Sequence, residues 1–231
     1  MKNITVIKQG LDVFKRDTIS VDGDKSLSIR FILLSSLSRG KCTATNLLKS
    51  EDVINAVNCI KKLGIKIKLN NKLCEVIGKG LFGYRFSKRL ILNAGNSGTT
   101  ARLLFSVLAN STKWVKITGD KSLKKRYMNR IIKPLKFLCV KIKKNNKKLP
   151  ISLMGSKLLR PINFTEKLGS AQSKSAVMIA ALKAKGKTKL KCLPSRNHTE
   201  LMFKNVLKIP INLKKENGFE IIEIEGMNEF N

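Results

Sequence analysis

The chain has 231 residues, 42% of them hydrophobic, which supports one large domain or two small ones with a sizeable core. No apolar run approaches the ~18–20 residues that a membrane span needs, and the first residues lack the apolar stretch of a signal peptide, so we expect a soluble, cytoplasmic protein that contacts no membrane. The net charge of +32 comes mainly from lysine, and the few aromatic residues (6%) do not alternate with basic runs. We therefore expect no nucleic-acid partner, although a basic nucleic-acid binder stays the alternative class of function.

Residues 19–83 are predicted to form the first of three repeated units. The small, polar segment Gly23-Asp24-Lys25-Ser26 precedes a helix, whose apolar side chains recur at helical spacing: Ile29, Ile32, Leu33 and Leu37. A second helix starts near Ser50, with two acidic residues in its first turn. Its inward side chains are Val53, Val57, Ile60 and Leu63. Alternation over residues 65–69 predicts a strand.

Residues 84–148 are predicted to form the second unit. The segment Gly95-Asn96-Ser97-Gly98-Thr99 opens a helix with the apolar stripe Ala101, Leu104, Phe105 and Leu108. The paired helix carries Met128, Ile131, Ile132, Leu135 and Leu138. A strand at 140–143 follows, and the lysine- and asparagine-rich run 141–148 is typical of a solvated hairpin rather than a DNA site.

Residues 149–227 are predicted to form the third unit. The segment Gly169-Ser170-Ala171-Gln172-Ser173 opens a helix with a stripe of smaller residues: Val177, Ala180, Ala181 and Ala184. The paired helix begins at Asn197, where Glu200 has the spacing of a capping box. Its apolar side is Leu201, Phe203, Val206 and Leu207. A strand over 211–213 follows.

Each unit reads strand, helix, strand, helix, strand, strand, so the fold class is α/β, and Ser26, Ser97 and Ser170 recur at a near-constant interval. With pseudo-threefold packing, the three helix starts meet at one end, where unpaired N–H groups and the helix dipole favour anions. Basic residues accompany them: Lys25, Arg30, Arg102, Arg126, Lys174 and Arg196. Any one of them alone would be read as a solvated cation, but together they suit a small ligand with several negative charges.

The cysteines and the single histidine indicate no metal site. The five cysteines form no CxxC pair, which argues against a disulfide framework or structural zinc, so we expect buried or half-buried free thiols. No cluster of further ligands surrounds His198, for which we expect a hydrogen-bonding role at a helix start, with a contact to ligand as the alternative.

Five co-linear motifs resemble the EPSP synthase family of enolpyruvyl transferases. They are the segments 23–30, 95–102, 119–128, 169–181 and 195–200. The resemblance implies transfer of the enolpyruvyl group of phosphoenolpyruvate to the 5-hydroxyl of shikimate 3-phosphate, with loss of phosphate from a tetrahedral intermediate and without metal or organic cofactor. It also implies two domains, each an inside-out α/β barrel of three units, with the active site between them.

The resemblance implies roles for individual residues. Lys25 matches the catalytic lysine that contacts both substrates. Positions that match shikimate 3-phosphate contacts are Lys25, Ser26, Arg30, Ser170, Ala171, Gln172, Ser195 and Arg196. Positions that match phosphoenolpyruvate contacts are Lys25, Asn96, Gly98 and Arg126. Arg102 lies within a motif, but its contact with ligand is left open.

The chain also departs from the family pattern. Tyr127 stands where the family usually has proline, and Val21-Asp22 stands where it prefers one. The chain is about half as long as family members. We expect residues 1–18 to be a strand segment that packs with the missing second domain, and residues 19–231 to form the shikimate 3-phosphate-binding domain. We also expect the chain alone to be inactive. The second domain would come in cis or in trans, and the complete enzyme would be a monomer.

Two relatives of this fold are the nearest alternatives. The sister enzyme that acts on UDP-N-acetylglucosamine uses a cysteine in a mobile loop, but this chain has no cysteine between Cys74 and Cys139. RNA 3′-phosphate cyclases share a related architecture, but the motifs around Lys25-Ser26 and Gln172 favour the shikimate branch.

Overall fold

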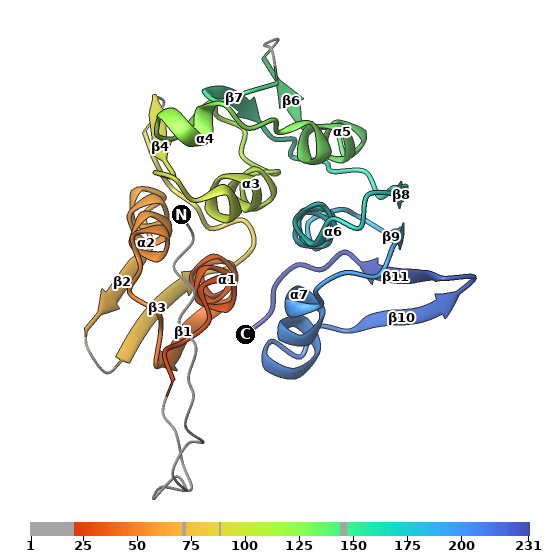
Figure 1. The fold of residues 1–231 in the computed structure, drawn as a ribbon, viewed down its shortest axis with the longest axis horizontal. Coiled ribbons are helices and arrows are strands. Elements are labelled where there is room, and N and C mark those ends of the chain that lie inside the picture. Colours follow the sequence, from red (N-terminus) through yellow and green to blue (C-terminus); the bar gives the residue numbers. More distant parts are fainter. Residues whose placement is uncertain (1–20, 71–72, 88, 144–146) are drawn as a thin grey trace, which may run out of the picture.

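The computed structural model describes residues 21–70, 73–87, 89–143 and 147–231 as a mixed α/β fold with three small sheets (Figure 1). The strand expected within residues 1–18, and its packing against a second domain, lie outside these residues. In Figure 1, α1, α3 and α6 are seen nearly end-on towards the middle of the molecule, and the sheets lie around them. α3 packs against both α1 and α6.

The first sheet is antiparallel, in the order β1-β3-β2. Its strands are β1 (Arg39–Thr45), β2 (Lys66–Leu69) and β3 (Leu73–Lys79). The accompanying helices are α1 (Lys25–Ser35) and α2 (Glu51–Lys62). The apolar stripes expected for both helices are buried, because each helix turns them towards the core.

The second sheet has the order β4-β5-β7-β6. Its strands are β4 (Leu90–Asn93), β5 (Val115–Thr118), β6 (Lys141–Ile142) and β7 (Ile151–Met154). Its helices are α3 (Gly98–Val107), the single turn α4 (Lys121–Lys124) and α5 (Asn129–Phe137). β6 and β7 pair antiparallel, as expected for a hairpin. β7 lies beyond residue 148, so this sheet extends past the boundary expected between the second and third units.

The third sheet has the order β10-β11-β9-β8. Its strands are β8 (Asn163–Glu166), β9 (Lys187–Cys192), β10 (Ile211–Glu216) and β11 (Phe219–Glu225). Its helices are α6 (Ala171–Ala181), the short α7 (His198–Leu201) and the π-helical turn η1 (Met202–Val206). In the second sheet β4 and β5 pair in parallel, and in the third sheet β8 and β9 do so. The remaining pairs in both sheets are antiparallel.

α6 is the most deeply buried helix among the described residues. Every residue from Ser173 to Ala181 is buried, which requires small side chains because neighbouring elements cover the helix on all sides. Within the fold it contacts α3, α5, β9 and β11. The small residues expected in this stripe therefore allow α6 to pack between the helices α3 and α5 and the third sheet.

The helix expected from Asn197 differs from its prediction. Phe203 and Leu207 are buried as expected, but Leu201 and Val206 are 46% and 62% exposed. For Val206 the cause is the change from α-helix to π-helix after Leu201, because a wider turn shifts the phase of the following residues. The Asn197 side chain forms no capping bond, and Glu200 instead lies within ion-pair distance of Lys174.

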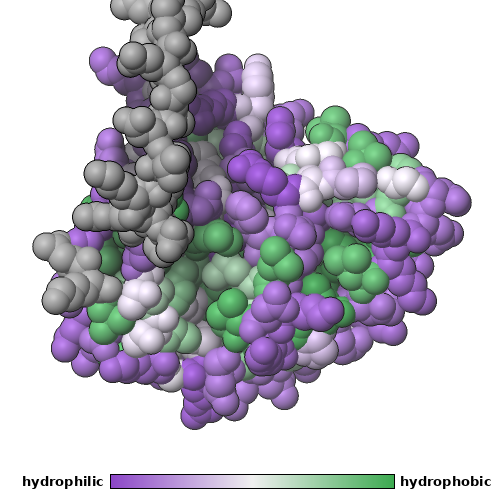
Figure 2. Space-filling view, turned by 60° about the horizontal axis from the view of Figure 1, so that its bottom comes forward, coloured by the Kyte–Doolittle hydropathy of each residue, from purple (hydrophilic) through white to green (hydrophobic). Residues whose placement is uncertain are grey.

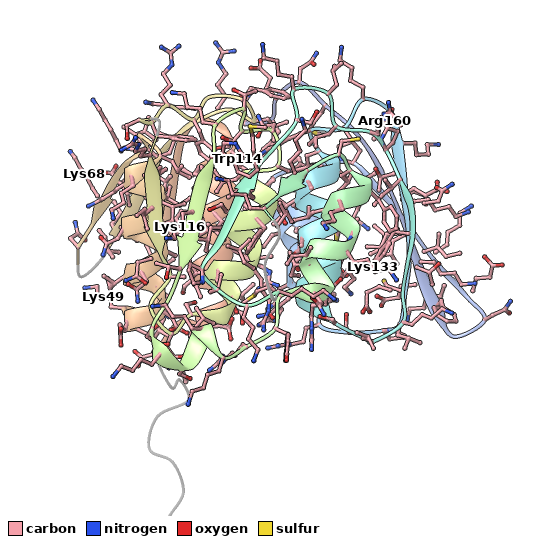
Figure 3. The ribbon with its side chains drawn as sticks, turned by 90° about the horizontal axis from the view of Figure 1, so that it is seen from above. Lys49, Lys68, Trp114, Lys116, Lys133 and Arg160 are labelled. Carbon is pink, nitrogen blue, oxygen red and sulfur yellow. The ribbon has the colours of Figure 1, made fainter. Side chains whose placement is uncertain are left out.

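The surface carries its positive charge on many elements. In Figure 3, the labelled cations Lys49, Lys68, Lys116, Lys133 and Arg160 lie at separate places around the molecule. Figure 2 shows hydrophobic residues as separate patches among hydrophilic ones. No helix within the described residues is long and apolar enough to cross a membrane.

Candidate functional site

Three helices begin with the same kind of cap. Asp24 Oδ1 accepts a hydrogen bond from the N–H of Leu27 at 2.7 Å, at the start of α1. At the starts of α3 and α6, Ser97 Oγ and Ser170 Oγ accept from backbone N–H groups at 3.2 and 3.3 Å. The caps at positions 24, 97 and 170 are equally spaced, so Asp24, and not Ser26, is the counterpart of the two serines. Each cap satisfies one N–H group, while other N–H groups of the first turn stay available to a ligand.

Glycines allow the chain to enter these helices. Gly95 and Gly169 have φ of 57° and 61°, a left-handed conformation that costs glycine little. Position 23 requires glycine for a different reason, because a Cβ there would lie 2.0 Å from the backbone oxygen of Asn46. The Glu166 carboxylate also fixes the entry to α6, by accepting from the N–H groups of Leu168 and Ser170, both at 3.0 Å.

Two arginines lie over the start of α3. A Cβ built on Gly98 would lie 2.9 Å from Arg102 Nη1 and 3.4 Å from Arg126 Nη1. Arg126 Nη2 donates to Asn96 Oδ1 at 3.1 Å. Three residues predicted to contact phosphoenolpyruvate, Asn96, Gly98 and Arg126, are therefore brought together. Glycine at position 98 leaves room for the guanidinium groups.

Gln172 joins this cluster to the start of α6. Its Oε1 accepts from Arg102 Nη1 at 2.7 Å, and its Nε2 donates to Thr99 Oγ1 at 2.9 Å. The side chain thus bridges the first turns of α3 and α6, and Arg102 holds its orientation. Ala171 is the first residue of α6, next to the cap Ser170.

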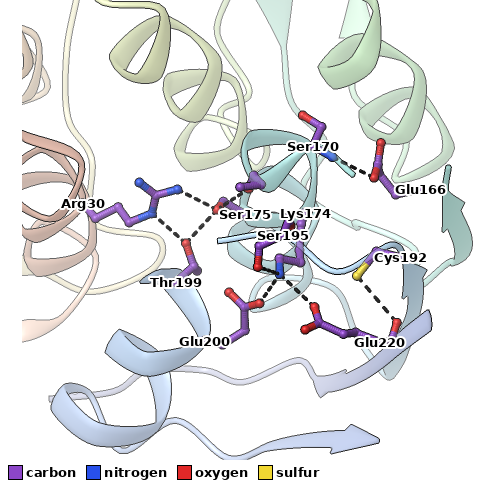
Figure 4. A network of polar contacts seen from close by, with 11 residues as sticks. Arg30, Glu166, Ser170, Lys174, Ser175, Cys192, Ser195, Thr199, Glu200 and Glu220 are labelled. Carbon is purple, nitrogen blue, oxygen red and sulfur yellow. Dashed lines mark hydrogen bonds and ion pairs between the residues drawn. The ribbon is translucent and has the colours of Figure 1, made fainter. Parts of the chain in front are cut away.

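Arg30 lies on the other side of α6 and is almost fully buried (Figure 4). Its Nε donates to Thr199 Oγ1 and its Nη2 to Ser175 Oγ, both at 2.9 Å, and its Nη1 donates to the carbonyl oxygen of Ser26 at 3.2 Å. Burial, followed by the positive charge of Arg196, lowers the pKa of Arg30. Arg30 therefore joins α1 to α6 and α7 through neutral oxygens.

Three further residues lie on the loop before α7 and at the start of that helix. Arg196 is exposed, and Ser195 Oγ is buried without a hydrogen-bond partner among the described residues. A buried hydroxyl without a partner costs free energy that a polar ligand would recover. Burial, followed by the charge of Arg30, lowers the pKa of the half-buried His198. The structure places His198 at the start of α7 and in the electrostatic range of Arg30 and Arg196.

Lys25 is the first residue of α1 and points towards α2. Its Nζ lies 3.0 Å from Asp52 Oδ2, and its side chain is 52% exposed. An exposed ion pair of this kind contributes up to about 1 kcal/mol, so little free energy opposes movement of Lys25 to a ligand. Ser26 is half-buried, and its backbone oxygen is occupied by Arg30.

Lys174 was expected among the cations at the helix starts, and this expectation is wrong. Its side chain is fully buried, with Nζ 2.5 Å from Glu200 Oε1 and 3.0 Å from Glu220 Oε2 (Figure 4). Lys174, four residues after the cap Ser170, faces Glu200 on α7 and Glu220 on β11 of the third sheet. Lys174 is therefore a structural residue of the core.

Arg130 is the residue that the sequence analysis missed. It is the second residue of α5, and its Nη1 donates to Ser170 Oγ at 3.4 Å. The available signal was its position four residues after Arg126, which is one helical turn, in a chain where arginine is rare beside lysine.

The site is strongly positive. Within the described part of the chain, Arg30, Arg102, Arg126, Arg130 and Arg196 form no ion pair within 4.0 Å. The described residues also contain no group of three or more His, Cys, Asp or Glu placed to hold a metal ion. The five cysteines are free thiols, and their burial, three buried and two half-buried, is as expected. The arrangement favours an anion with more than one charge.

The chain is similar to known proteins over most of its length. The family model described as EPSP synthase (3-phosphoshikimate 1-carboxyvinyltransferase) matches residues 15–230. A 3-phosphoshikimate 1-carboxyvinyltransferase of Caldicellulosiruptor saccharolyticus is 42% identical over 217 residues, which is 92% of this chain and 49% of that protein. One from a Thermoanaerobacter species is 40% identical over 216 residues, or 92% of this chain and 50% of that protein.

Solved structures give the same match. An EPSP synthase from Acinetobacter baumannii superposes with a TM-score of 0.82 at 31% identity, over 92% of this chain and 47% of that one. The chain thus spans about half the length of the curated relatives and solved structures that it matches.

Proposed function

Because this chain belongs to the EPSP synthase family, we propose that it forms the shikimate 3-phosphate-binding half of an enzyme that transfers the enolpyruvyl group of phosphoenolpyruvate to the 5-hydroxyl of that substrate, giving EPSP and phosphate. The observation that carries the proposal is the cluster of arginines at the capped starts of α3 and α6, which have no ion-pair partner among the residues that the structure describes. Its charge and its donors suit two small substrates that both carry phosphate and carboxylate groups.

In this proposal the three sheets and their helices form a domain with pseudo-threefold symmetry, the inside-out α/β barrel of the family. The equal spacing of the caps at positions 24, 97 and 170 supports that arrangement. The three capped helices then direct their N-termini to one end, and this end faces the second domain.

Shikimate 3-phosphate would bind around the first turn of α6. The proposed contacts are Lys25, Ser26, Arg30, Ser170, Ala171, Gln172, Ser195 and Arg196. Because Arg30 is held by three neutral oxygens, it would act with little change of geometry. The buried hydroxyl of Ser195 would gain the partner that it lacks.

Phosphoenolpyruvate would bind at the start of α3, on Asn96, Gly98 and Arg126. Lys25 would leave Asp52 to contact both substrates as the catalytic cation. The 5-hydroxyl group would lose its proton as its oxygen adds to the central carbon of phosphoenolpyruvate, and the methylene carbon of phosphoenolpyruvate would gain a proton to become a methyl group. Loss of one proton from that methyl group, together with loss of phosphate, would then restore the double bond.

The second domain would reach this one in cis or in trans, since the chain covers about half of its relatives. We propose that the second domain supplies the proton-transfer groups and that the completed enzyme acts as a monomer. The test uses this chain alone. Calorimetry should detect binding of shikimate 3-phosphate, and a mixture with both substrates should release no phosphate. Rapid turnover by this chain alone, or no affinity together with salt-sensitive DNA binding, would overturn the proposal.

Arg196→Ala should weaken shikimate 3-phosphate binding by about 1–3 kcal/mol, because a charge-assisted contact is lost from an exposed arginine that folding does not need. Calorimetric titration of the purified chain measures the change. The control is Lys204→Ala, which removes an exposed positive charge from η1, next along the chain from α7. Equal affinities of the Arg196 variant and the control would refute the role of Arg196.

A further inference from the structure

Arg130 is fixed beside the cap of α6 by two contacts. Its Nη1 donates to Ser170 Oγ at 3.4 Å, and its backbone oxygen accepts from Ser173 Oγ at 2.9 Å. The second contact joins the first turn of α5 to the first turn of α6, so it fixes the position of the Arg130 backbone from which the side chain extends. The long distance to Ser170 marks a weak hydrogen bond, which a stronger acceptor would replace readily.

Arg130 belongs to a cluster of three guanidinium groups. Burial, followed by the charges of Arg130 and then Arg126, lowers the pKa of Arg102. Arg102 Nη1 and Arg126 Nη1 both lie close to the Cβ position of Gly98. Like charges repel at short range, so this arrangement is unfavourable until an anion enters it.

No carboxylate of the described residues offsets this repulsion. Neither Arg102, Arg126 nor Arg130 has an ion-pair partner within 4.0 Å in the described ranges. Glu166, which contacts the cap residue Ser170, directs its oxygens to the N–H groups of Leu168 and Ser170. Its charge therefore serves the loop before α6.

The Arg130 side chain is also open to ligand. It lines a groove of about 570 Å³ with Tyr127, Lys133 and Phe137, and an adjoining one of about 290 Å³ in which Lys133 also takes part. Arginine has five N–H donors in a planar fork, and among the described residues Arg130 uses one of them, towards Ser170. The remaining donors suit two oxygens of a phosphate group.

We infer that Arg130 is a further substrate-binding residue, which binds the phosphate group of shikimate 3-phosphate beside the hydroxyl of Ser170. The inference rests on the proposed function and deepens it. Arg126 has a different place, since Asn96 holds it over the start of α3. The two arginines, four residues apart in the sequence, would thus serve different substrates at the starts of two helices.

The experiment measures binding of shikimate 3-phosphate and of shikimate to the full chain, by calorimetry for the first ligand and by ligand-observed NMR for the weaker one. Arg130→Ala should weaken binding of shikimate 3-phosphate by roughly tenfold or more and change binding of shikimate by less than about twofold. Arg130→Lys should recover part of the loss, because lysine keeps the charge and loses the fork.

Lys133→Ala is the matched control. Lys133 is exposed, lies on the same helix, lines the same two grooves and carries the same charge. We expect it to change affinity for shikimate 3-phosphate by less than about twofold. Unchanged thermal unfolding midpoints would show that all variants fold.

Three results would contradict the role of Arg130, and they differ in what they leave standing. Equal losses in Arg130→Ala and Lys133→Ala would reduce Arg130 to a contributor to general positive charge. Equal losses for shikimate 3-phosphate and shikimate would place Arg130 away from the phosphate group. No binding of shikimate 3-phosphate by the unaltered chain would overturn the proposed function itself, and this inference with it.

Discussion

Lys174→Met is expected to lower the free energy of unfolding by about 3–5 kcal/mol, the largest loss that we predict for a single substitution. The ammonium group is fully buried and lies 2.5 Å from Glu200 and 3.0 Å from Glu220. Desolvation alone would lower the pKa of Lys174, but the two glutamates outweigh it and the pKa is raised. Methionine fills a similar volume, so the loss reports the two carboxylates left without a cation.

Urea unfolding at neutral pH measures this loss. Lys189→Met is the matched control, because Lys189 lies on β9, is 50% exposed and is 3.9 Å from Glu223. An exposed pair contributes up to about 1 kcal/mol, so the control should stay close to wild type. Combining Lys174→Met with Glu200→Gln and Glu220→Gln should recover much of the stability. Similar losses for Lys174→Met and the control would show that burial of the ion pair has no special weight.

The periodic features of the chain could be predicted from sequence. The stripes on α1, α2, α3, α5 and α6 are buried because helical spacing follows from local geometry alone. The capped helix starts were also visible, since small and polar residues recur before each stripe. Such signals need no knowledge of what lies across the interior.

The role of a charged residue could not be predicted in the same way. Lys174 and Lys25 both stand in the first turn of a helix, yet one is buried and the other is half exposed. The difference lies in Glu200 and Glu220, which come from distant parts of the chain. A lysine at the head of a fully buried helix was the available hint, because such a charge needs an acidic partner.

Two other differences also arise from tertiary contacts. The π-helical turn after Leu201 exposes Val206, although the sequence pattern placed Val206 inside. Arg130 was missed because a pattern on α5 does not show that its helical face meets Ser170. Strand pairing also depends on tertiary contacts, since β7 pairs with β5 of the second sheet although it lies beyond the boundary expected between the second and third units.

Lys183 is a buried lysine that has no carboxylate partner within the described ranges of the chain. Its Nζ donates to the carbonyl oxygen of Val107 at 2.5 Å and to Asn110 Oδ1 at 2.9 Å, and lies 5.8 Å from the ring centroid of Tyr84. Burial lowers the pKa of Lys183 from 10.5 to about 7. Burial also raises the pKa of Tyr84, whose hydroxyl bonds Ser36, so the phenol keeps its proton in this range.

The direction of the pH dependence follows from the proton that Lys183 takes up on unfolding. Between about pH 7 and 10.5, the folded state has released the proton of Lys183 while the unfolded chain still binds it. Unfolding then takes up a proton, so the free energy of unfolding rises with pH. Relative to Lys183→Met, in which this group is absent, the wild type should gain about 2 kcal/mol between about pH 7 and 9.

Urea unfolding of both proteins at several pH values measures this difference. Lys185→Met is the control, because Lys185 is exposed and only two residues further along the chain. This control should keep the pH dependence of the wild type. A constant difference between wild type and Lys183→Met over this range would mean that Lys183 keeps its proton in the fold. The carbonyl of Val107 and the amide of Asn110 would then solvate the ammonium group as well as water does, and the three chain segments that meet there would be held by a permanent charge.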